Sequence, residues 1–235
     1  MEQHRLVSQD EWVEARKALL AKEKQFTKLR DDLSAERRDL PWVEVDRNYV
    51  FDGPDGPQSL ADLFDGRDQL IVYHFMFGPD WQEGCPSCSL IADTFDDAIV
   101  HLNQRDVSMV VISRAPYEKL RSYEDRMGWH FKWLSSENTD FNRDFHVTFT
   151  AAERESGQAY YNYQSSGFPV DEAPGLSVFY KDQDGRIYHT YSTYGRGLDP
   201  LMSTYQFLDL VPKGRDEDGL DFPMAWVRRH DEYGG

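Results

Sequence analysis

Residues 70–88, which read LIVYHFMFGPDWQEGCPSC, decide the fold. Residues 70–77 form a continuous apolar run with turn residues on both sides, which is typical of a central strand buried on both faces. A loop over 78–84 leads to Cys85-Pro86-Ser87-Cys88, and apolar residues then recur at helical spacing up to residue 102. Because proline is favoured at the first position of a helix, the pattern predicts Cys85 at a helix N-cap.

Strand and helix patterns keep alternating after this helix. Residues 107–113 and 131–134 predict strands on either side of a helix over 116–127. A β-hairpin follows over 176–191 and a last helix over 199–210, while a strand, a turn and a short helix precede the cysteine strand over 49–64. The order is a βαβ half joined to a ββα half, which predicts an α/β protein with a mixed sheet between two helical layers.

Three segments lie outside this core. An N-terminal extension, residues 1–41, contains a predicted amphipathic helix over 8–37 that would pack on the core or serve as a dimerisation arm. The core domain covers 42–211 and contains an aromatic-rich insertion at about 150–172, which would pack onto the domain or line a groove. Residues 212–235 predict a charged, solvated tail.

Composition narrows the range of functions. The 235 residues carry 26 Lys and Arg against 42 Asp and Glu, a formal net charge of −16, which disfavours binding to nucleic acid or to an anionic membrane. No apolar run approaches the roughly 20 residues of a membrane-spanning helix, and the N-terminus lacks a signal-peptide pattern. We therefore expect a cytoplasmic protein, in which two cysteines at Cys-x-x-Cys spacing indicate a redox-active pair.

The arrangement resembles the thioredoxin superfamily: an apolar strand, Cys-x-x-Cys at a helix start, a βα unit, then X-Pro ahead of a hairpin and a final helix. The segments 49–64 and 107–134 resemble its peroxiredoxin and thiol-reductase branch. With the N-terminal helix, the insertion and the tail around residues 226–233, the chain resembles a bacterial family of thioredoxin-like proteins of unknown function, described as predicted dithiol-disulfide oxidoreductases. The resemblance spans residues 42–210 and implies a thioredoxin-like three-layer α/β/α sandwich with peroxiredoxin-like N-terminal strands.

The two cysteines would carry the chemistry. A thiolate attacks a disulfide, and Cys85 at a helix N-terminus would face free amide hydrogens that favour its anion. Cys88, one turn further on, would then displace the bound half of the substrate. Thioredoxins place a buried aspartate in the preceding strand to assist proton transfer. His74 stands at about that position, where it would accept the Cys88 proton or be an ordinary core histidine.

The resemblance also implies substrate contacts. In the superfamily a cis-proline opens the strand that faces the dithiol and guides an extended substrate, and Ala173-Pro174 occupies the matching place. Trp81, in the loop before the motif, could cover the thiols, and Pro86 lies within the motif. We therefore expect all four residues to contact substrate. No cofactor or metal is expected, because two cysteines cannot form a four-thiolate zinc site.

Together these features predict a dithiol-disulfide oxidoreductase that acts on a protein or small-molecule disulfide, depends on a separate reductant and could form a homodimer. The alternative enzyme is a thiol peroxidase, in which Cys85 forms a sulfenic acid that Cys88 resolves. Peroxiredoxins carry Pro-x-x-x-Thr-x-x-Cys, whereas Pro79 stands six residues before Cys85 with no threonine between them. The third interpretation is a non-catalytic binding or redox-sensing module.

Overall fold

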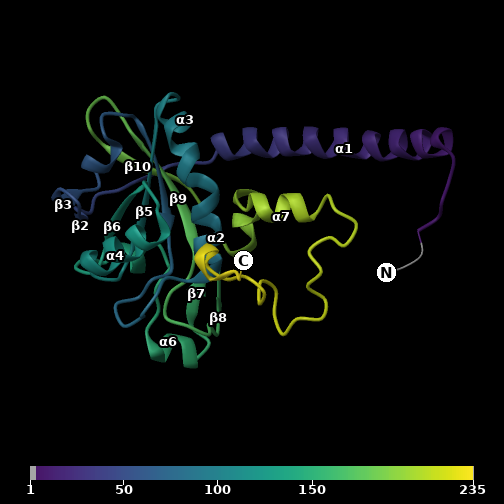
Figure 1. The fold of residues 1–235 in the computed structure, drawn as a ribbon. Coiled ribbons are helices and arrows are strands. Elements are labelled where there is room, and N and C mark those ends of the chain that lie inside the picture. Colours follow the sequence, from purple (N-terminus) through teal and green to yellow (C-terminus); the bar gives the residue numbers. More distant parts are fainter. Residues whose placement is uncertain (1–3, 235) are drawn as a thin grey trace. The chain divides into compact units, whose positions relative to one another are not determined.

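The protein is seen here in a computed structural model that describes residues 4–234 (Figure 1). Residues 1–3, on which the signal-peptide expectation partly rests, and residue 235 of the tail lie outside the described residues. The chain divides into two compact units, Met1–Pro41 and Trp42–Gly235.

The first unit is dominated by one helix, α1 (Gln9–Arg38). The Ser8 side chain accepts a hydrogen bond from the Glu11 amide, and the Glu11 carboxylate accepts one from the Ser8 amide. This capping box satisfies two otherwise free donors of the first turn and confirms the predicted helix start. None of the residues of α1 is buried, and large apolar side chains such as Trp12 and Phe26 are exposed. The use of this helix in dimerisation stays a prediction.

The second unit is built on an eight-stranded mixed sheet with the order β1-β10-β9-β4-β5-β6-β2-β3. The strands are β1 (Val43–Glu44), β2 (Val50–Gly53), β3 (Gly56–Ser59), β4 (Gln69–His74), β5 (Val107–Ser113), β6 (Lys132–Ser135), β9 (Gly175–Lys181) and β10 (Ile187–Tyr194). β4 pairs with β5 in parallel and with β9 antiparallel, and β9 pairs with β10 antiparallel. The central order β5-β4-β9-β10 joins a βαβ half to a ββα half, so the predicted thioredoxin-like fold is confirmed.

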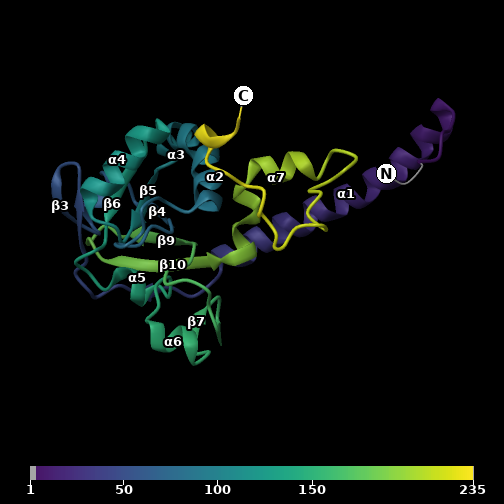
Figure 2. The ribbon, with the colours of Figure 1, turned by 60° about the horizontal axis from the view of Figure 1, so that its bottom comes forward.

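Helices cover both faces of the sheet. They are η1 (Asp62–Phe64), α2 (Pro86–Phe95), η2 (Asp96–Ala98), α3 (Ile99–Asn103), α4 (Tyr117–Met127), α5 (Phe141–Asp144), η3 (Gly195–Leu201), α7 (Ser203–Leu208) and η4 (His230–Glu232). Figure 2 shows α2, α3 and α4 on one side of the sheet and α5 on the other. The central strand β4 serves both layers: Tyr73 joins the core under α2 and α4, whereas Leu70 and Val72 join the core under η1 and α5.

The insertion has its own small structure. α6 (Ala151–Glu155) is followed by a two-stranded hairpin of β7 (Ala159–Tyr161) and β8 (Gln164–Ser166). Its aromatic residues pack against Phe149 and the buried Ala173 of the host domain. This arrangement supports the interpretation that the aromatic side chains hold the insertion onto the domain.

Several segments differ from the sequence-based expectations. The predicted turn after residue 51 is the hairpin of β2 and β3, and the helix expected over 89–102 is divided into α2, η2 and α3. The largest correction concerns the tail, which is not a free solvated segment: Val227 is only 3% exposed, and Asp231 pairs with Arg126 of α4. Within residues 4–234, no helix combines the length and apolar character that crossing a membrane requires.

Candidate active site

The cysteine motif begins α2 at the end of the central strand. Cys85 is the N-cap of α2, and Pro86 occupies the first helical position, as predicted. The Cys85 amide donates to the Met76 carbonyl at 3.0 Å, which fixes the start of the motif to the chain that continues β4. The helix therefore holds Cys85 where the free amides of its first turn converge.

The two thiols differ in burial and in acidity. Cys85 is partly exposed, Cys88 is buried, and both are free cysteines. A hydrogen bond from the Cys88 side chain, the amides of Cys88 and Ser87, and the charge of Arg229 together lower the pKa of Cys85 to about 7, although burial opposes them. Burial and the neighbouring Cys85 raise the pKa of Cys88 well above its ordinary value. At neutral pH, Cys85 is thus the more readily deprotonated of the two thiols, and Cys88 stays protonated.

The side chain of β4 that faces the thiols is Tyr73, not His74. The Tyr73 ring is fully buried, and its hydroxyl makes no hydrogen bond of normal geometry with any described residue. This hydroxyl nevertheless lies close enough to Cys88 to favour the Cys88 thiolate, while burial and the nearby Cys88 raise the pKa of Tyr73 well above 10. Tyr73 is therefore a neutral hydrogen-bond donor held beside the buried thiol.

His74 lies on the opposite face of the sheet, away from the cysteines. Its Nε2 is 2.9 Å from the Ser177 Oγ, and its ring stacks on Phe141 and Phe145. Burial lowers the pKa of His74 to about 3, so it is uncharged at neutral pH. The position of His74 therefore does not support the predicted catalytic role, and it agrees with the alternative interpretation, an ordinary core histidine.

The tail supplies a cation at the motif. The Arg229 side chain, 12% exposed, donates from Nη2 to the Gly84 carbonyl and from Nε to the Tyr123 hydroxyl, both at 2.8 Å. The Tyr123 hydroxyl contacts the Ser89 Oγ at 3.0 Å, and Ser89 donates to the Cys85 carbonyl at 3.0 Å. This chain of hydrogen bonds joins the tail and α4 to the first turn of α2. Residues in such a chain polarise one another, so their effects are coupled.

A cavity of about 370 Å³ opens beside the dithiol. Both Cys85 and Cys88 line it, together with Pro174 and residues from η3, α7 and the tail. Most of its walls are apolar side chains, among them Ile91 and Leu198. The arrangement gives the partly exposed thiol a hollow of the size in which proteins bind small ligands or side chains.

Of the four predicted substrate contacts, only Pro174 lines this cavity. No cis peptide bond occurs among the described residues, so the expected cis bond between Ala173 and Pro174 is wrong. Ala173 is buried in the small core under the insertion. Trp81 donates from Nε1 to Asp171 at 3.0 Å and packs in the loop, and Pro86 begins α2 outside the cavity lining.

The insertion reaches the cavity through Tyr161. The Tyr161 hydroxyl donates to the Pro174 carbonyl and accepts from the Gly195 amide, both at 2.7 Å. Pro174 and Gly195 both line the cavity, on segments that are far apart in sequence. Tyr161 therefore fixes the relative position of two parts of the cavity wall.

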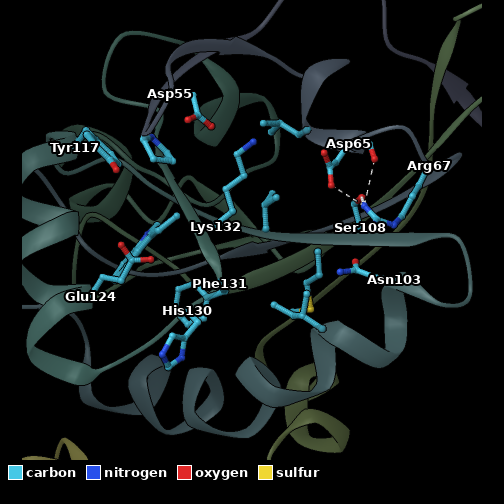
Figure 3. Close-up of a pocket in the computed structure, with 16 residues that line it drawn as sticks. Asp55, Asp65, Arg67, Asn103, Ser108, Tyr117, Glu124, His130, Phe131 and Lys132 are labelled. Carbon is cyan, nitrogen blue, oxygen red and sulfur yellow. Dashed lines mark hydrogen bonds and ion pairs between the residues drawn. The ribbon is translucent and has the colours of Figure 1, made fainter.

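A second cavity, of about 420 Å³, is lined by β5, β6 and the turn between β2 and β3, and no cysteine lines it (Figure 3). Figure 3 shows Lys132 between Asp55 and Asp65, and Arg67 bonded to Asp65 and Ser108. Burial raises the pKa of Glu124, on the same wall, to about 7. In the part of the chain that the structure describes, no group of three or more His, Cys, Asp and Glu side chains is placed to hold a metal ion. The dithiol is therefore the centre that carries recognisable chemistry.

Sequence reasoning missed Tyr73, Arg229 and Tyr161. The strand alternation contains a signal for Tyr73, because residues 71, 73, 75 and 77 share a face and residue 77 leads directly into the motif loop. Arg229 stands 144 positions after Cys85, and Tyr161 stands 34 positions before Gly195. Nothing local in the sequence predicts either contact.

The fold and the dithiol define a thioredoxin-fold protein with a Cys-x-x-Cys motif at the start of α2. The chain belongs to the family described as bacterial protein of unknown function (DUF899), whose model matches residues 1–233. No curated protein matches the sequence.

Solved structures with a similar course of chain include two peroxiredoxins and a thiol:disulfide interchange protein. The peroxidoxin BcpB from Mycobacterium tuberculosis is 15% identical, with 70% of this chain and 95% of that chain covered and a TM-score of 0.47. A mutant of PrxQ from Xylella fastidiosa is 10% identical, with 70% and 94% covered and a TM-score of 0.46. A protein described as a thiol:disulfide interchange protein DsbE from Chlorobium tepidum is 10% identical, with 70% and 97% covered and a TM-score of 0.43.

Proposed function

We propose that the protein is a dithiol-disulfide oxidoreductase that works through Cys85 and Cys88. The observation that carries the proposal is the difference between the two thiols: Cys85 is partly exposed with a pKa lowered to about 7, and Cys88 is buried with a raised pKa. A low pKa makes an attacking thiolate available at neutral pH, and the buried partner is protected from outside reactants. Both free thiols fit a reducing compartment such as the cytoplasm.

In the first step the Cys85 thiolate attacks one sulfur of a substrate R–S–S–R′. The substrate S–S bond breaks, R′S⁻ leaves and takes up a proton, and Cys85 is joined to RS in a mixed disulfide. In the second step Cys88 gives up its proton and attacks the Cys85 sulfur, the bond between Cys85 and RS breaks, and RS⁻ leaves and takes up a proton. The substrate thereby gains two electrons and two protons, and Cys85–Cys88 becomes a disulfide that a separate dithiol must reduce.

Tyr73 assists the second step in this scheme. Once Cys85 is in the mixed disulfide, its sulfur no longer carries the anion that held the Cys88 proton. The Tyr73 hydroxyl, which makes no hydrogen bond of normal geometry with a described residue, is then available to donate to the forming Cys88 thiolate. A hydrogen bond to a charged group contributes about 1.5–3 kcal/mol, which is enough to lower the pKa of a buried thiol substantially.

The test is turnover of a protein disulfide, such as that of insulin, by the protein with a small dithiol as reductant. Cys85→Ser should abolish turnover, and Cys88→Ser should stop at a mixed disulfide that mass spectrometry detects as one substrate half attached to Cys85. Retained turnover in Cys85→Ser contradicts the proposal. Consumption of hydrogen peroxide with a thiol donor, much faster than by free cysteine and with no disulfide turnover, would favour the thiol peroxidase instead.

A further inference from the structure

The cavity beside the dithiol is apolar where it would meet a substrate. Its apolar side chains come from the segment after β4, from α2, from the residue before β9, from η3, from the N-cap of α7 and from the tail. They are Met76, Ile91, Pro174, Leu198, Met202, Pro223 and Met224. Because Cys85 lines the same cavity, a group bonded to the substrate sulfur would come to lie against these side chains.

Three of the charged groups of the cavity, Asp199, Arg215 and Glu217, are closely paired within the protein, whereas Arg196 is 85% exposed and meets Asp199 only at 3.6 Å. Arg215 donates two hydrogen bonds of 2.9 Å to Asp199 and also binds Asp209. Glu217 accepts hydrogen bonds from the Tyr205 hydroxyl and, at 2.9 Å, from the Trp226 ring nitrogen. A ligand that bound these groups would have to break satisfied ion pairs and hydrogen bonds, which costs free energy. Apart from Ser87 and the exposed Arg196, the cavity therefore offers a ligand mainly apolar surface.

The methionines of the wall make it adaptable. Three of the seven apolar side chains are unbranched thioethers, Met76, Met202 and Met224. Methionine has several rotatable bonds and a polarizable sulfur, so a wall rich in it adjusts to aliphatic and aromatic groups of different shape. A cavity of about 370 Å³ is at the lower end of the range in which proteins bind small ligands.

We propose that this cavity binds a bulky apolar group next to the reacting sulfur, so that the protein prefers disulfides flanked by leucine or an aromatic residue over small polar ones such as glutathione disulfide. The inference rests on the proposed function and names its substrate class. Burying one large apolar side chain increases binding by about 10- to 100-fold, and we expect a preference of that order.

The experiment compares three homodisulfides of acetyl-Cys-X-amide, in which X is Gly, Leu or Phe and the reacting sulfur is unchanged. The reduced protein is mixed with each disulfide, the reaction is quenched with acid, and the Cys85–Cys88 disulfide is quantified by mass spectrometry. We expect the Leu and Phe compounds to react about 10-fold faster or more than the Gly compound.

The chain offers a matched pair of variants. Met202 lines the dithiol cavity, Met109 lines the second cavity, and both are 7% exposed. Met202→Gln should reduce the ratio of the Phe rate to the Gly rate at least threefold, whereas Met109→Gln should keep it. Met224→Gln, at a less buried position of the same wall, should lower the ratio as Met202→Gln does. It provides a second test of the wall if Met202→Gln fails to fold.

Each outcome bears on one of the two proposals. Equal rates for the three disulfides, or an equal drop of the Phe-to-Gly ratio in Met109→Gln and Met202→Gln, would overturn the apolar preference while the oxidoreductase stands. If none of the disulfides oxidises the Cys85–Cys88 pair, the proposed function itself fails.

Discussion

Replacing Arg229 by glutamine should raise the pKa of Cys85 and slow its reaction at neutral pH. The guanidinium lies beside the motif, 12% exposed and bonded to the Gly84 carbonyl, and its charge is one of the causes that lower the pKa of Cys85. An opposite charge within about 4–6 Å shifts a pKa by roughly 1–3 units. Arg229 contributes less than the Cys88 thiol and the helix amides do, so we take the lower end of this range. The pKa of Cys85 should therefore rise from about 7 to about 8.

This change has a signature in the dependence of rate on pH. At pH 7 the thiolate fraction falls from about one half to about one tenth, but the more basic thiolate is intrinsically about threefold more nucleophilic. The variant should thus react about half as fast as the wild type at pH 7 and about two- to threefold faster at pH 9. The two profiles should cross at about pH 7.6. A variant that is slow only because its fold is damaged would react more slowly than the wild type at every pH.

The assay is the stopped-flow reaction of the reduced protein with excess aromatic disulfide between pH 5 and 10. Arg228→Gln is the matched control, because Arg228 is exposed and its guanidinium donates, among the described residues, to backbone carbonyls of the tail. Arg229→Lys, which keeps the charge, should keep the midpoint near 7. A midpoint that does not move in Arg229→Gln, with urea unfolding as in the wild type, would refute the electrostatic role of the tail.

Three further substitutions test the surroundings of the dithiol. Tyr73→Phe removes the hydroxyl beside Cys88, so the mixed disulfide on Cys85 should persist about 10-fold longer in quenched samples, with an unchanged first step. Tyr161→Phe leaves the Gly195 amide and the Pro174 carbonyl without their partner, and should lower the free energy of unfolding by about 1–3 kcal/mol in urea titrations. Burial, only partly offset by Arg114, raises the pKa of Glu172 from 4.5 to about 7, so the folded state holds this proton more tightly than the unfolded chain. Stability should therefore fall by on the order of 3 kcal/mol as the pH rises from about 4.5 to about 7.5, and Glu172→Gln should remove that slope.

The sequence was informative where local physical rules decide the structure. The apolar run of residues 70–77 predicted the central strand, the alternation of patterns predicted the fold, and Pro86 predicted the N-cap position of Cys85. Each of these rests on the order of neighbouring residues, namely the period of the pattern or the constraint that proline places on a helix start.

The predictions for His74 and the tail are wrong because the structure there depends on the register of a single residue or on contacts with a distant segment. Adjacent side chains of a strand point to opposite faces, so His74, the predicted proton acceptor, lies on the side of the sheet away from the thiols, and its neighbour Tyr73 lies beside Cys88. The tail is predicted to be solvated because it is charged, yet Arg229 and Asp231 have partners on the domain. Charge patterning in one sequence cannot distinguish a solvated run from one whose partners lie about 100 residues away.

The position of the two sulfurs fixes the order in which they react. Burial of a thiol in apolar surroundings raises its pKa, whereas amide hydrogens and a cation lower it, and here the first acts most on Cys88 and the second on Cys85. In the proposed reaction an external disulfide is therefore attacked by Cys85, since Cys88 is both protonated and buried. Formation of the mixed disulfide removes the negative charge of Cys85, which was one cause of the raised pKa of Cys88. In the proposed reaction the first step thereby activates Cys88, the nucleophile of the second step. The thioredoxin fold places the motif at the start of α2, and Arg229 of the tail increases the difference between the pKa values of the two thiols.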